Sequence, residues 1–462
     1  MSLLPPNVVS LWRRTLRLAA PATGQFAASS LMRTTDVLIT ASITPAALVA
    51  LGVSDLLVSL ATRVGNGYVV GANTLASQDT GSGAHGLRDQ SVTQASVLAI
   101  VVAVPFVVLY LSIPAQLFEL IGASDRVIKL GVPYVRVVAL TVPLITLREV
   151  AGNALRAIGD AKTPMYVTVP MDLLNAGLSL ALGLGWFGAP NYGILGVGVA
   201  TVVASTLGTI ILCGYLATRS PIQYTVPRNP TVAVQLTRVA APVAATGFVT
   251  SFAVLPFNAL LLSIGTTVNA GYQLAWRVYS QVVGPVSRGM GVAARTVVGQ
   301  EIGTSTVDHH DQPLSVSQAA TFITLLTIVV GALWGVGTVV AAEPLVTLLA
   351  ESRSAAEAAI PFLSVLGGLS VLFVTNNVLT SVLEGGSETR VPLVSRLVGT
   401  YGGMVGVSWL ALQFDNGVES FYLGLGACYT AMLGVTLWGL TQTDWVGRGT
   451  RMVDERDSTT SD

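Results

Sequence analysis

Three acidic residues stand inside long, otherwise apolar runs of this sequence: Asp36, Asp55 and Asp172. An acid among apolar residues is costly unless it faces a cavity or a partner, so each is a candidate functional group. Such a carboxylate can alternate between a protonated and an ionised form. Together with amide and hydroxyl oxygens it can also bind a hard cation. These residues therefore predict binding and release of a proton or of Na+.

Asp36 and Asp55 are expected at similar depths on two adjacent helices. Counted from the turn near Thr44, they lie about eight and eleven residues away, or about 12 to 17 Å at about 1.5 Å per residue. They could therefore share one cavity. The alternative for Asp55 is a structural ion pair with Arg33 or Arg63, and Arg33 is the corresponding partner for Asp36.

Motifs for other kinds of chemistry are missing from the sequence. It contains no Walker lysine loop, nucleophile elbow or histidine-rich metal motif. His85, His309 and His310 fall in expected loops, and Cys213 and Cys428 stand in apolar stretches without a partner motif. We therefore expect neither an enzyme nor a chain that needs a cofactor. A membrane-embedded enzyme using Asp36 with Asp172 is the alternative, and the absent nucleophile counts against it.

Composition places the chain in the membrane. Of 462 residues only 10% are charged and 52% are hydrophobic, and the mean hydropathy is +0.68. Soluble domains carry about 25% charged residues, whereas lipid-facing surface must be nearly free of charge. The 24 basic and 24 acidic residues give a net charge of zero, and this excludes nucleic acid as a partner because phosphate binding needs surplus Lys and Arg.

Charge-poor runs predict twelve membrane-spanning helices and hence an all-α polytopic fold, since one crossing needs about 20 apolar residues. The expected spans are residues 14–42, 46–70, 91–112, 127–152, 164–186, 193–217, 234–263, 268–295, 314–341, 355–382, 391–413 and 420–440. The lipid bilayer is thus the first expected partner, in the cell (plasma) membrane. The polar tail, residues 443–462, is expected to be disordered.

The distribution of basic residues predicts that both termini are cytoplasmic. With that orientation the cytoplasmic segments collect Arg13, Arg14, Arg17, Arg88, Arg156, Lys162, Arg219, Arg228, Arg238, Arg295, Arg390, Arg448, Arg451 and Arg456. The opposite side holds only Arg126, Lys129 and Arg353.

An internal repeat divides the chain into two halves. Leu18-Ala-Ala-Pro21 recurs as Val239-Ala-Ala-Pro242, and Gln78-Asp-Thr-Gly81 recurs as Gln300-Glu-Ile-Gly303. Since six helices separate the copies, the halves have the same orientation and an axis along the membrane normal should relate them. The expected lobes are residues 1–220 and 233–442, joined by a cytoplasmic linker at 221–232.

These motifs resemble the multidrug and toxic compound extrusion (MATE) transporters. The likeness covers residues from about 11 to 440, and its most specific part is the segment Leu155-Arg-Ala-Ile-Gly-Asp-Ala-Lys-Thr-Pro-Met165 leading into Leu174-Asn175. The resemblance implies twelve helices in two six-helix lobes around a cavity that opens alternately to each side. It also implies export of cationic amphiphilic small molecules in exchange for inward H+ or Na+. A lipid-linked glycan flippase of the same superfamily is the alternative, and the few scattered arginines do not favour it.

The resemblance assigns roles to particular residues. Asp36 matches the acid of the family's first helix and Pro21 the proline that bends it, while Asn175 and Thr201 match the other members of its cation site. Ser179 departs from the pattern, because related members carry a second acid there. Asp172 is our own candidate for the missing carboxylate, because positions 172, 175 and 179 share one helix face.

Five further polar residues are candidates for the cavity of one lobe or the other. They are Gln25, Asn258, Arg277, Asn376 and Asn377. For Arg277, and for Arg396, a structural ion pair is the favoured alternative. We expect the protein to be a monomer.

Overall fold

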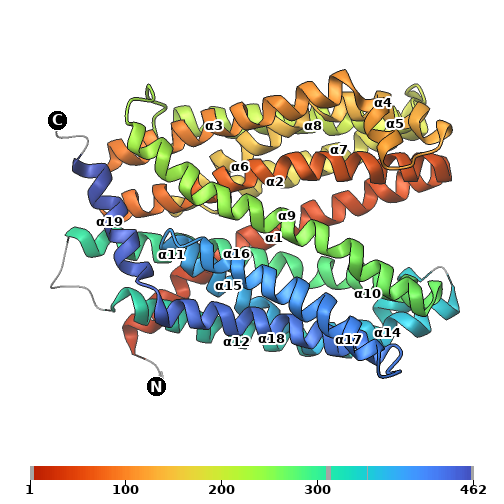
Figure 1. Cartoon of the computed structure of the whole chain (residues 1–462). Helices are drawn as coiled ribbons and strands as arrows, with labels where there is room; N and C mark the ends of the chain where they lie inside the picture. Colours follow the sequence, from red (N-terminus) through yellow and green to blue (C-terminus); the bar gives the residue numbers. More distant parts are fainter. Residues whose placement is uncertain (1–4, 308–313, 351, 459–462) are drawn as a thin grey trace. The chain divides into compact units, whose positions relative to one another are not determined.

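The computed structural model describes residues 5–307, 314–350 and 352–458, and every regular element within these ranges is a helix (Figure 1). The first half contains α1 (Pro6–Ile43), α2 (Pro45–Gly81), α3 (His85–Ser112), α4 (Pro114–Leu120), α5 (Asp125–Val138), α6 (Thr141–Ala157), α7 (Lys162–Leu184), the short 3-10 helix η1 (Trp186–Gly188) and α8 (Ile194–Arg219). The second half contains α9 (Pro230–Ile264), α10 (Thr266–Val282), α11 (Gly284–Val307), α12 (Val316–Val340), α13 (Ala342–Leu349), α14 (Arg353–Gly368), α15 (Ser370–Gly385), α16 (Arg390–Leu397), the π-helix η2 (Val398–Val407), α17 (Ser408–Leu412), α18 (Glu419–Gln442) and α19 (Trp445–Ser458).

The membrane-spanning character of these helices follows from their length and apolar composition. Within the described ranges, eight helical segments are long and apolar enough to cross a bilayer, and a ninth forms if α14 and α15 count as one span. These two helices meet at an angle of 50°. The bend follows Gly367-Gly368, a sequence that weakens helix continuity.

Each of the twelve predicted spans coincides with a helix or with consecutive helices. The differences lie at the ends and at the breaks: α2 continues to Gly81 and α11 to Val307, beyond the expected limits. The span expected at 268–295 is divided between α10 and α11, just before Gly284-Pro285. Proline disfavours helical backbone at the residue before it, and this accounts for the break.

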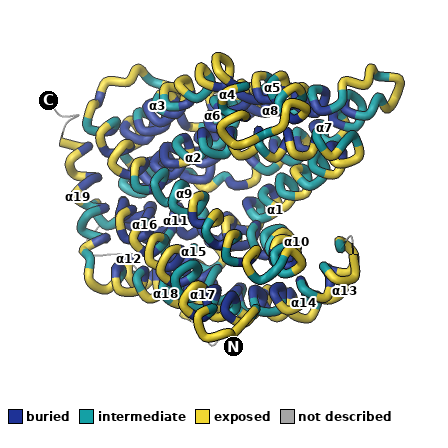
Figure 2. Tube along the Cα trace, turned by 45° about the vertical axis from the view of Figure 1, so that its right-hand side comes forward, coloured by how far each residue is buried: buried dark blue, intermediate teal, exposed yellow. Residues whose placement is uncertain are grey.

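The described chain separates into two compact units. Unit 1 comprises residues 1–23, 77–83 and 245–455, and unit 2 comprises residues 24–76, 84–244 and 456–462. The core of unit 1 contains edge-to-face aromatic pairs, among them Phe257 with Tyr272 and with Phe421. The core of unit 2 contains small and branched apolar side chains of α3, α5, α6 and α8. Figure 2 shows the buried positions along α3 and α6.

Reciprocal glycine contacts bring the repeated motifs together. A Cβ atom on Gly81 would overlap the carbonyl oxygen of Gln300, and one on Gly303 would overlap the carbonyl oxygen of Gln78. The two copies of the motif therefore cross within unit 1, where each needs its glycine.

The helices that carry the polar site of unit 2 are held by close backbone contacts. A Cβ atom on Gly196 of α8 would overlap the carbonyl of Leu182 on α7, and Gly183 of α7 lies against Val197 of α8. Small residues allow such approach between membrane helices. The contacts fix α7, which bears three of the predicted site residues.

The expectation of a disordered tail is wrong for residues 445–458, because they form α19. Trp445, Met452 and Val453 lie on one face of the helix and are buried, and Trp445 packs on Gly386. Arg448 makes a salt bridge of 2.8 Å with Glu388, and Asp444 accepts a hydrogen bond from the Gly447 amide at the start of the helix. The polar composition concealed this apolar stripe, and residues 459–462 lie outside the described part of the chain.

Candidate functional site

Helices α1 and α7 pair in parallel with a constant register. Ser29 contacts Asp172, Met32 contacts Asn175, and Asp36 contacts Ser179. Each of the three pairs is separated by 143 positions in the sequence. A constant difference means that the two helices run in the same direction, and the spacing of three and four residues keeps all contacts on one face of each. The polar residues predicted on α7 therefore face α1 along one seam.

Asp36 accepts hydrogen bonds from two neutral side chains of α7. The Ser179 hydroxyl donates to Oδ1 at 2.9 Å, and the Asn175 amide donates to Oδ2 at 3.0 Å. Ser179 and Asn175 are buried, at 0% and 1% exposure. Asp36 has no salt bridge with any residue that the structure describes. Its charge is thus stabilised by dipoles alone, and a cation can still neutralise it.

The site also contains oxygen atoms that lack hydrogen-bond partners. The Asn175 Oδ1 atom is buried without one, and so is the Thr40 hydroxyl, one helical turn from Asp36 on α1. Carboxylate, hydroxyl and amide oxygens are the ligands that hard cations prefer. The residues present therefore fit a proton or Na+ at Asp36. Thr40 was missed in the sequence, although its position four residues after Asp36 on the same helix face was the available signal.

Thr201 is not part of the hydrogen-bonded set at Asp36. Its hydroxyl donates instead to the Val197 carbonyl of its own helix at 3.0 Å. A threonine inside a helix commonly makes this bond. Its assignment as a cation ligand stays a prediction.

Asp172 forms a second polar contact on the same seam. Its Oδ2 atom accepts from the Ser29 hydroxyl at 2.6 Å, and its side chain is 6% exposed. Arg148, Glu149 and Arg33 interact with it electrostatically. Arg148 and Glu149 were overlooked as site residues, although both are charged and fall inside the span predicted at 127–152.

Asp55 lies in the first third of α2 and is exposed. It makes no hydrogen bond or salt bridge with a residue in the described ranges. The ion pair with Arg33 or Arg63 is accordingly not formed in this structure. Its position in a cavity stays a prediction.

Three of the remaining candidate residues form side-chain hydrogen bonds. Gln25 is buried and accepts from Arg156 at 2.6 Å, and Asn376 is buried and accepts from Thr436 at 2.8 Å. Asn258 accepts from Gln273 at 2.8 Å.

Asn377 and the two arginines lie in unit 1. The amide of Asn377 donates to Ser287 at 2.7 Å, and its oxygen accepts from Arg396 at 3.4 Å. Arg277 is exposed. No acid of the described chain pairs with Arg277 or Arg396, so the structural ion pairs favoured for them are not formed.

Pro21 and His85 both lie within helices. Pro21 stands inside α1, which continues through it, and the chain passes from unit 1 to unit 2 just after it, between Thr23 and Gly24. His85 is the first residue of α3 rather than part of a loop, while His309 and His310 lie outside the described residues. Within the described ranges no three His, Cys, Asp or Glu side chains are grouped as a metal site.

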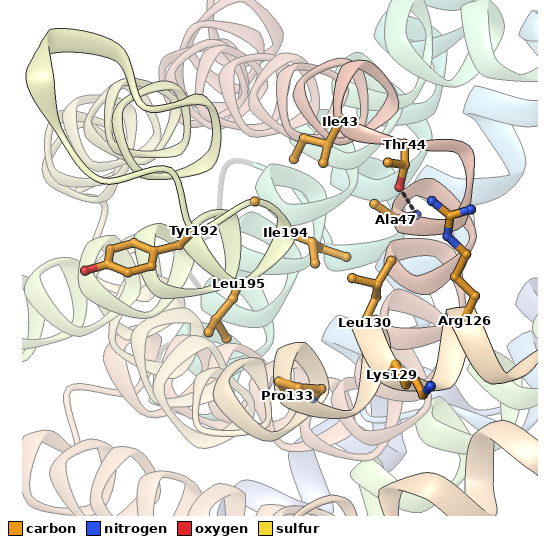
Figure 3. Close-up of a pocket in the computed structure, with 11 residues that line it drawn as sticks. Ile43, Thr44, Ala47, Arg126, Lys129, Leu130, Pro133, Tyr192, Ile194 and Leu195 are labelled. Carbon is orange, nitrogen blue, oxygen red and sulfur yellow. Dashed lines mark hydrogen bonds between the residues drawn. The ribbon is translucent and has the colours of Figure 1, made fainter.

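A separate cavity of about 440 Å³ lies beside the turn between α1 and α2. Its lining residues are Ile43, Thr44, Ala47, Arg126, Lys129, Leu130, Pro133, Tyr192, Gly193, Ile194 and Leu195. In Figure 3 the Arg126 side chain extends toward Thr44, while the Tyr192 ring points away from it. The lining holds two basic side chains and no carboxylate, so it is unsuited to a cation and distinct from the site at Asp36.

The duplicated helices and the half-buried acid among uncharged oxygens are those of a multi-pass membrane protein of the transporter type. Comparison with known proteins gives the family. The family model described as MatE matches residues 21–180 and 242–410, and the chain therefore belongs to the MatE family.

Relatives and solved structures agree with this assignment. A probable multidrug resistance protein NorM of Burkholderia pseudomallei is 27% identical over 446 residues, which cover 94% of this chain and 93% of the relative. A probable NorM of Thermotoga maritima is 26% identical over 62% of this chain, and the match spans only 60% of that relative's length. The match to the probable multidrug resistance protein YoeA of Bacillus subtilis, 28% identical, covers 44% of this chain and 45% of the relative.

Solved structures share the fold. A mutant of the Vibrio cholerae MATE transporter VcmN matches with a TM-score of 0.87 at 17% identity, covering 96% of this chain and 100% of the other. A transporter of the MOP superfamily from Pyrococcus furiosus matches with a TM-score of 0.84 at 19% identity, over 95% of this chain and 99% of the other. The predicted fold class, an all-α polytopic membrane protein with twelve spans in two six-helix lobes, is confirmed.

Proposed function

We propose that this protein exports cationic amphiphilic small molecules, drugs or toxic metabolites, in exchange for inward H+ or Na+. The observation that carries the proposal is Asp36, a carboxylate that two neutral donors hold and no described cation neutralises. Membership in the MatE family, whose relatives carry the names of multidrug resistance proteins, supports the export of small molecules. The protein needs no cofactor beyond the coupling ion.

The proposed mechanism is alternating access between two lobes. Cation binding at Asp36 removes a negative charge from the α1–α7 seam, and Pro21 allows α1 to respond by bending, since proline removes a backbone hydrogen bond. The membrane potential supplies sufficient energy, because one charge crossing it is worth about 2.3 kcal/mol per 100 mV.

The proposed setting is the plasma membrane, with both termini in the cytoplasm and a monomer as the working unit. The fourteen basic residues on one side support this orientation. The lobes at 1–220 and 233–442, with the linker at 221–232, remain our proposal for the moving bodies. The proposed substrate contacts are Asp55 and Arg277, which are exposed, together with Asn258 and Asn377.

A lipid-linked glycan flippase is the competing function. Such a protein must hold a pyrophosphate, which calls for clustered basic groups free of acids. In unit 2 the acids Asp36, Asp55 and Asp172 accompany the arginines, and this mixture favours a cation instead.

The deciding experiment uses purified protein in lipid vesicles. Ethidium efflux is measured with a Na+ gradient alone, a pH gradient alone, and neither. Antiport predicts efflux with at least one gradient and none without. Gradient-independent movement of a lipid-linked glycan, with no ethidium efflux, would establish the flippase.

A further inference from the structure

The α1–α7 seam contains two polar groupings of similar composition. At the first, Asp36 accepts from the Ser179 hydroxyl at 2.9 Å, and the neighbouring Asn175 Oδ1 has no partner. At the second, Asp172 accepts from the Ser29 hydroxyl at 2.6 Å, and the Thr168 hydroxyl has no partner. Each grouping thus combines a carboxylate, a serine that donates to it from the facing helix, and a buried oxygen that is unsatisfied.

Thr168 is an informative member of the second grouping. Its side chain is 1% exposed, and it precedes Asp172 by one helical turn on the same face of α7. Buried polar atoms in proteins almost always have a partner, so an unpaired hydroxyl one helical turn from a carboxylate indicates a water or ion that completes it. This observation is independent of the Asp172–Ser29 bond.

The two groupings are too far apart to hold one ion. Asp36 pairs with position 179 and Asp172 with position 29, a shift of seven residues on both helices. Seven residues correspond to about 10 Å along a helix. Oxygen ligands of one hard cation lie about 2.5 Å from it and therefore at most about 5 Å from each other.

We propose that Asp172, Ser29 and Thr168 form a second cation station, which receives the coupling ion after it leaves Asp36. This inference rests on the proposed antiport. It changes the role of Asp172 from a substitute ligand in the Asp36 shell to a station of its own. The shared register of α1 and α7 places both stations on the same seam between these helices.

Arg148 is suited to resetting the second station. Its guanidinium lies against α8, 3.2 Å from the position that a Cβ on Gly208 would occupy, and its Nε atom is buried without a partner. It makes no salt bridge with a described residue, yet it interacts electrostatically with Asp172. When the ion leaves, Arg148 can neutralise the Asp172 carboxylate. Glu149 and Arg33 are the other charged groups that act on Asp172. They carry opposite charges, so their effects on the Asp172 carboxylate oppose each other.

The test counts Na+ ions bound to the purified full-length protein at alkaline pH, with radioactive sodium as the probe. Two equivalents are expected for the wild type, one for Asp36→Asn, one for Asp172→Asn and none for the double variant. Glu357→Gln, which removes an exposed acid paired with Arg353 in unit 1, is the matched control and should retain two. An unchanged count in Asp172→Asn, or a single equivalent in the wild type, overturns the second station.

A second set of variants separates two stations from one shared shell. If Asp172 only compensated for the acid missing at Ser179, adding Ser179→Asp to Asp172→Asn would restore the lost equivalent with the wild-type affinity. If there are two stations, Ser179→Asp does not restore the lost Na+ equivalent, because the new acid lies beside Asp36 and not beside Asp172. Restoration therefore contradicts the proposal.

Folding and function are controlled separately. Thr168→Ala keeps the Asp172 carboxylate. It should lower the affinity for only one of the two bound Na+ ions, by at least about tenfold, which is about 1.4 kcal/mol. Equal weakening of both, or no weakening, contradicts the station. Efflux measured in parallel distinguishes the two proposals: ethidium transport without any gradient would refute antiport, whereas the binding count alone decides the station.

Discussion

Ser179 donates its hydroxyl hydrogen to Asp36, with Oγ and Oδ1 2.9 Å apart. In the pattern that the sequence resembles, an acid stands at this position. Two carboxylates so close together would repel each other and share a proton. The serine instead stabilises a single negative charge at the site. The site therefore carries one acid, and one monovalent cation suffices to neutralise it.

Ser179→Asp should strengthen Na+ binding at Asp36. A second carboxylate within hydrogen-bonding distance adds attraction for a cation, and we expect at least about tenfold tighter binding at alkaline pH, or about 1.4 kcal/mol. Ser179→Ala, which removes the hydrogen bond without adding charge, is the matched control. Sodium binding that is equally tight in Ser179→Asp and Ser179→Ala would show that position 179 does not face the ion.

Gly303→Ala should destabilise the protein. The added methyl group overlaps the Gln78 carbonyl, so the crossing of α2 with α11 must open. Overpacking of this kind costs about 1–3 kcal/mol. Gly337→Ala on α12 is the control, because its Cβ meets no atom within 4 Å and alanine favours a helix by up to about 1 kcal/mol. The comparison is made by thermal unfolding in detergent, and equal melting temperatures would contradict the close crossing.

The orientation in the membrane can be tested with single cysteines in a background that lacks Cys213 and Cys428. We expect labelling from outside at Asn191 and Asp415 but not at Arg228, because basic residues stay in the cytoplasm. All three positions are exposed, so differences in labelling report the side of the membrane. The reverse pattern would invert the topology.

The start of α19 should loosen in acid. The hydrogen bond from Arg451, together with that from the Gly447 amide, holds the pKa of the Asp444 carboxyl below its usual value. Because the folded-state pKa is lowered, this contribution is present above the unfolded pKa of about 3.9 and is lost as the pH falls through the folded value. Amide hydrogen exchange at the first turn, corrected for intrinsic rates, should rise there. Asp444→Asn should exchange without that dependence, and a wild type equally insensitive would exclude the cap.

Much of the fold could be predicted because it depends on local composition. Charge-free runs marked the spans, and the recurring Gln78-Asp-Thr-Gly81 motif indicated the duplication before its two copies were seen to cross. The tail was mispredicted because its apolar residues Trp445, Met452 and Val453 are few. They become significant only at helical spacing and against a partner such as Gly386.

The sequence could predict which site residues share a face of one helix, but not which residues of two helices meet. The common face of Asp172, Asn175 and Ser179 follows from helical spacing, and the resemblance supplied Asp36. The register between α1 and α7 depends on packing across about 140 residues of chain, as the contacts show. For that reason the pairing of Asp172 with Ser29 could not be foreseen, and although spacing placed Thr40 and Thr168 on the faces of Asp36 and Asp172, it could not show that their hydroxyls lack partners.

The central claim is that Asp36 couples an ion gradient to export, and Asp36→Asn tests it most directly. Asparagine keeps the size and can still accept from Ser179, but it cannot bind a proton or balance Na+. The variant and the wild type are first matched for expression and melting temperature, with Glu357→Gln as the control that loses an acid elsewhere. Ethidium efflux is then measured in vesicles under imposed Na+ and H+ gradients. We predict that gradient-driven efflux is abolished in Asp36→Asn and retained in Glu357→Gln; a well-folded Asp36→Asn protein that pumps at the wild-type rate would contradict the account.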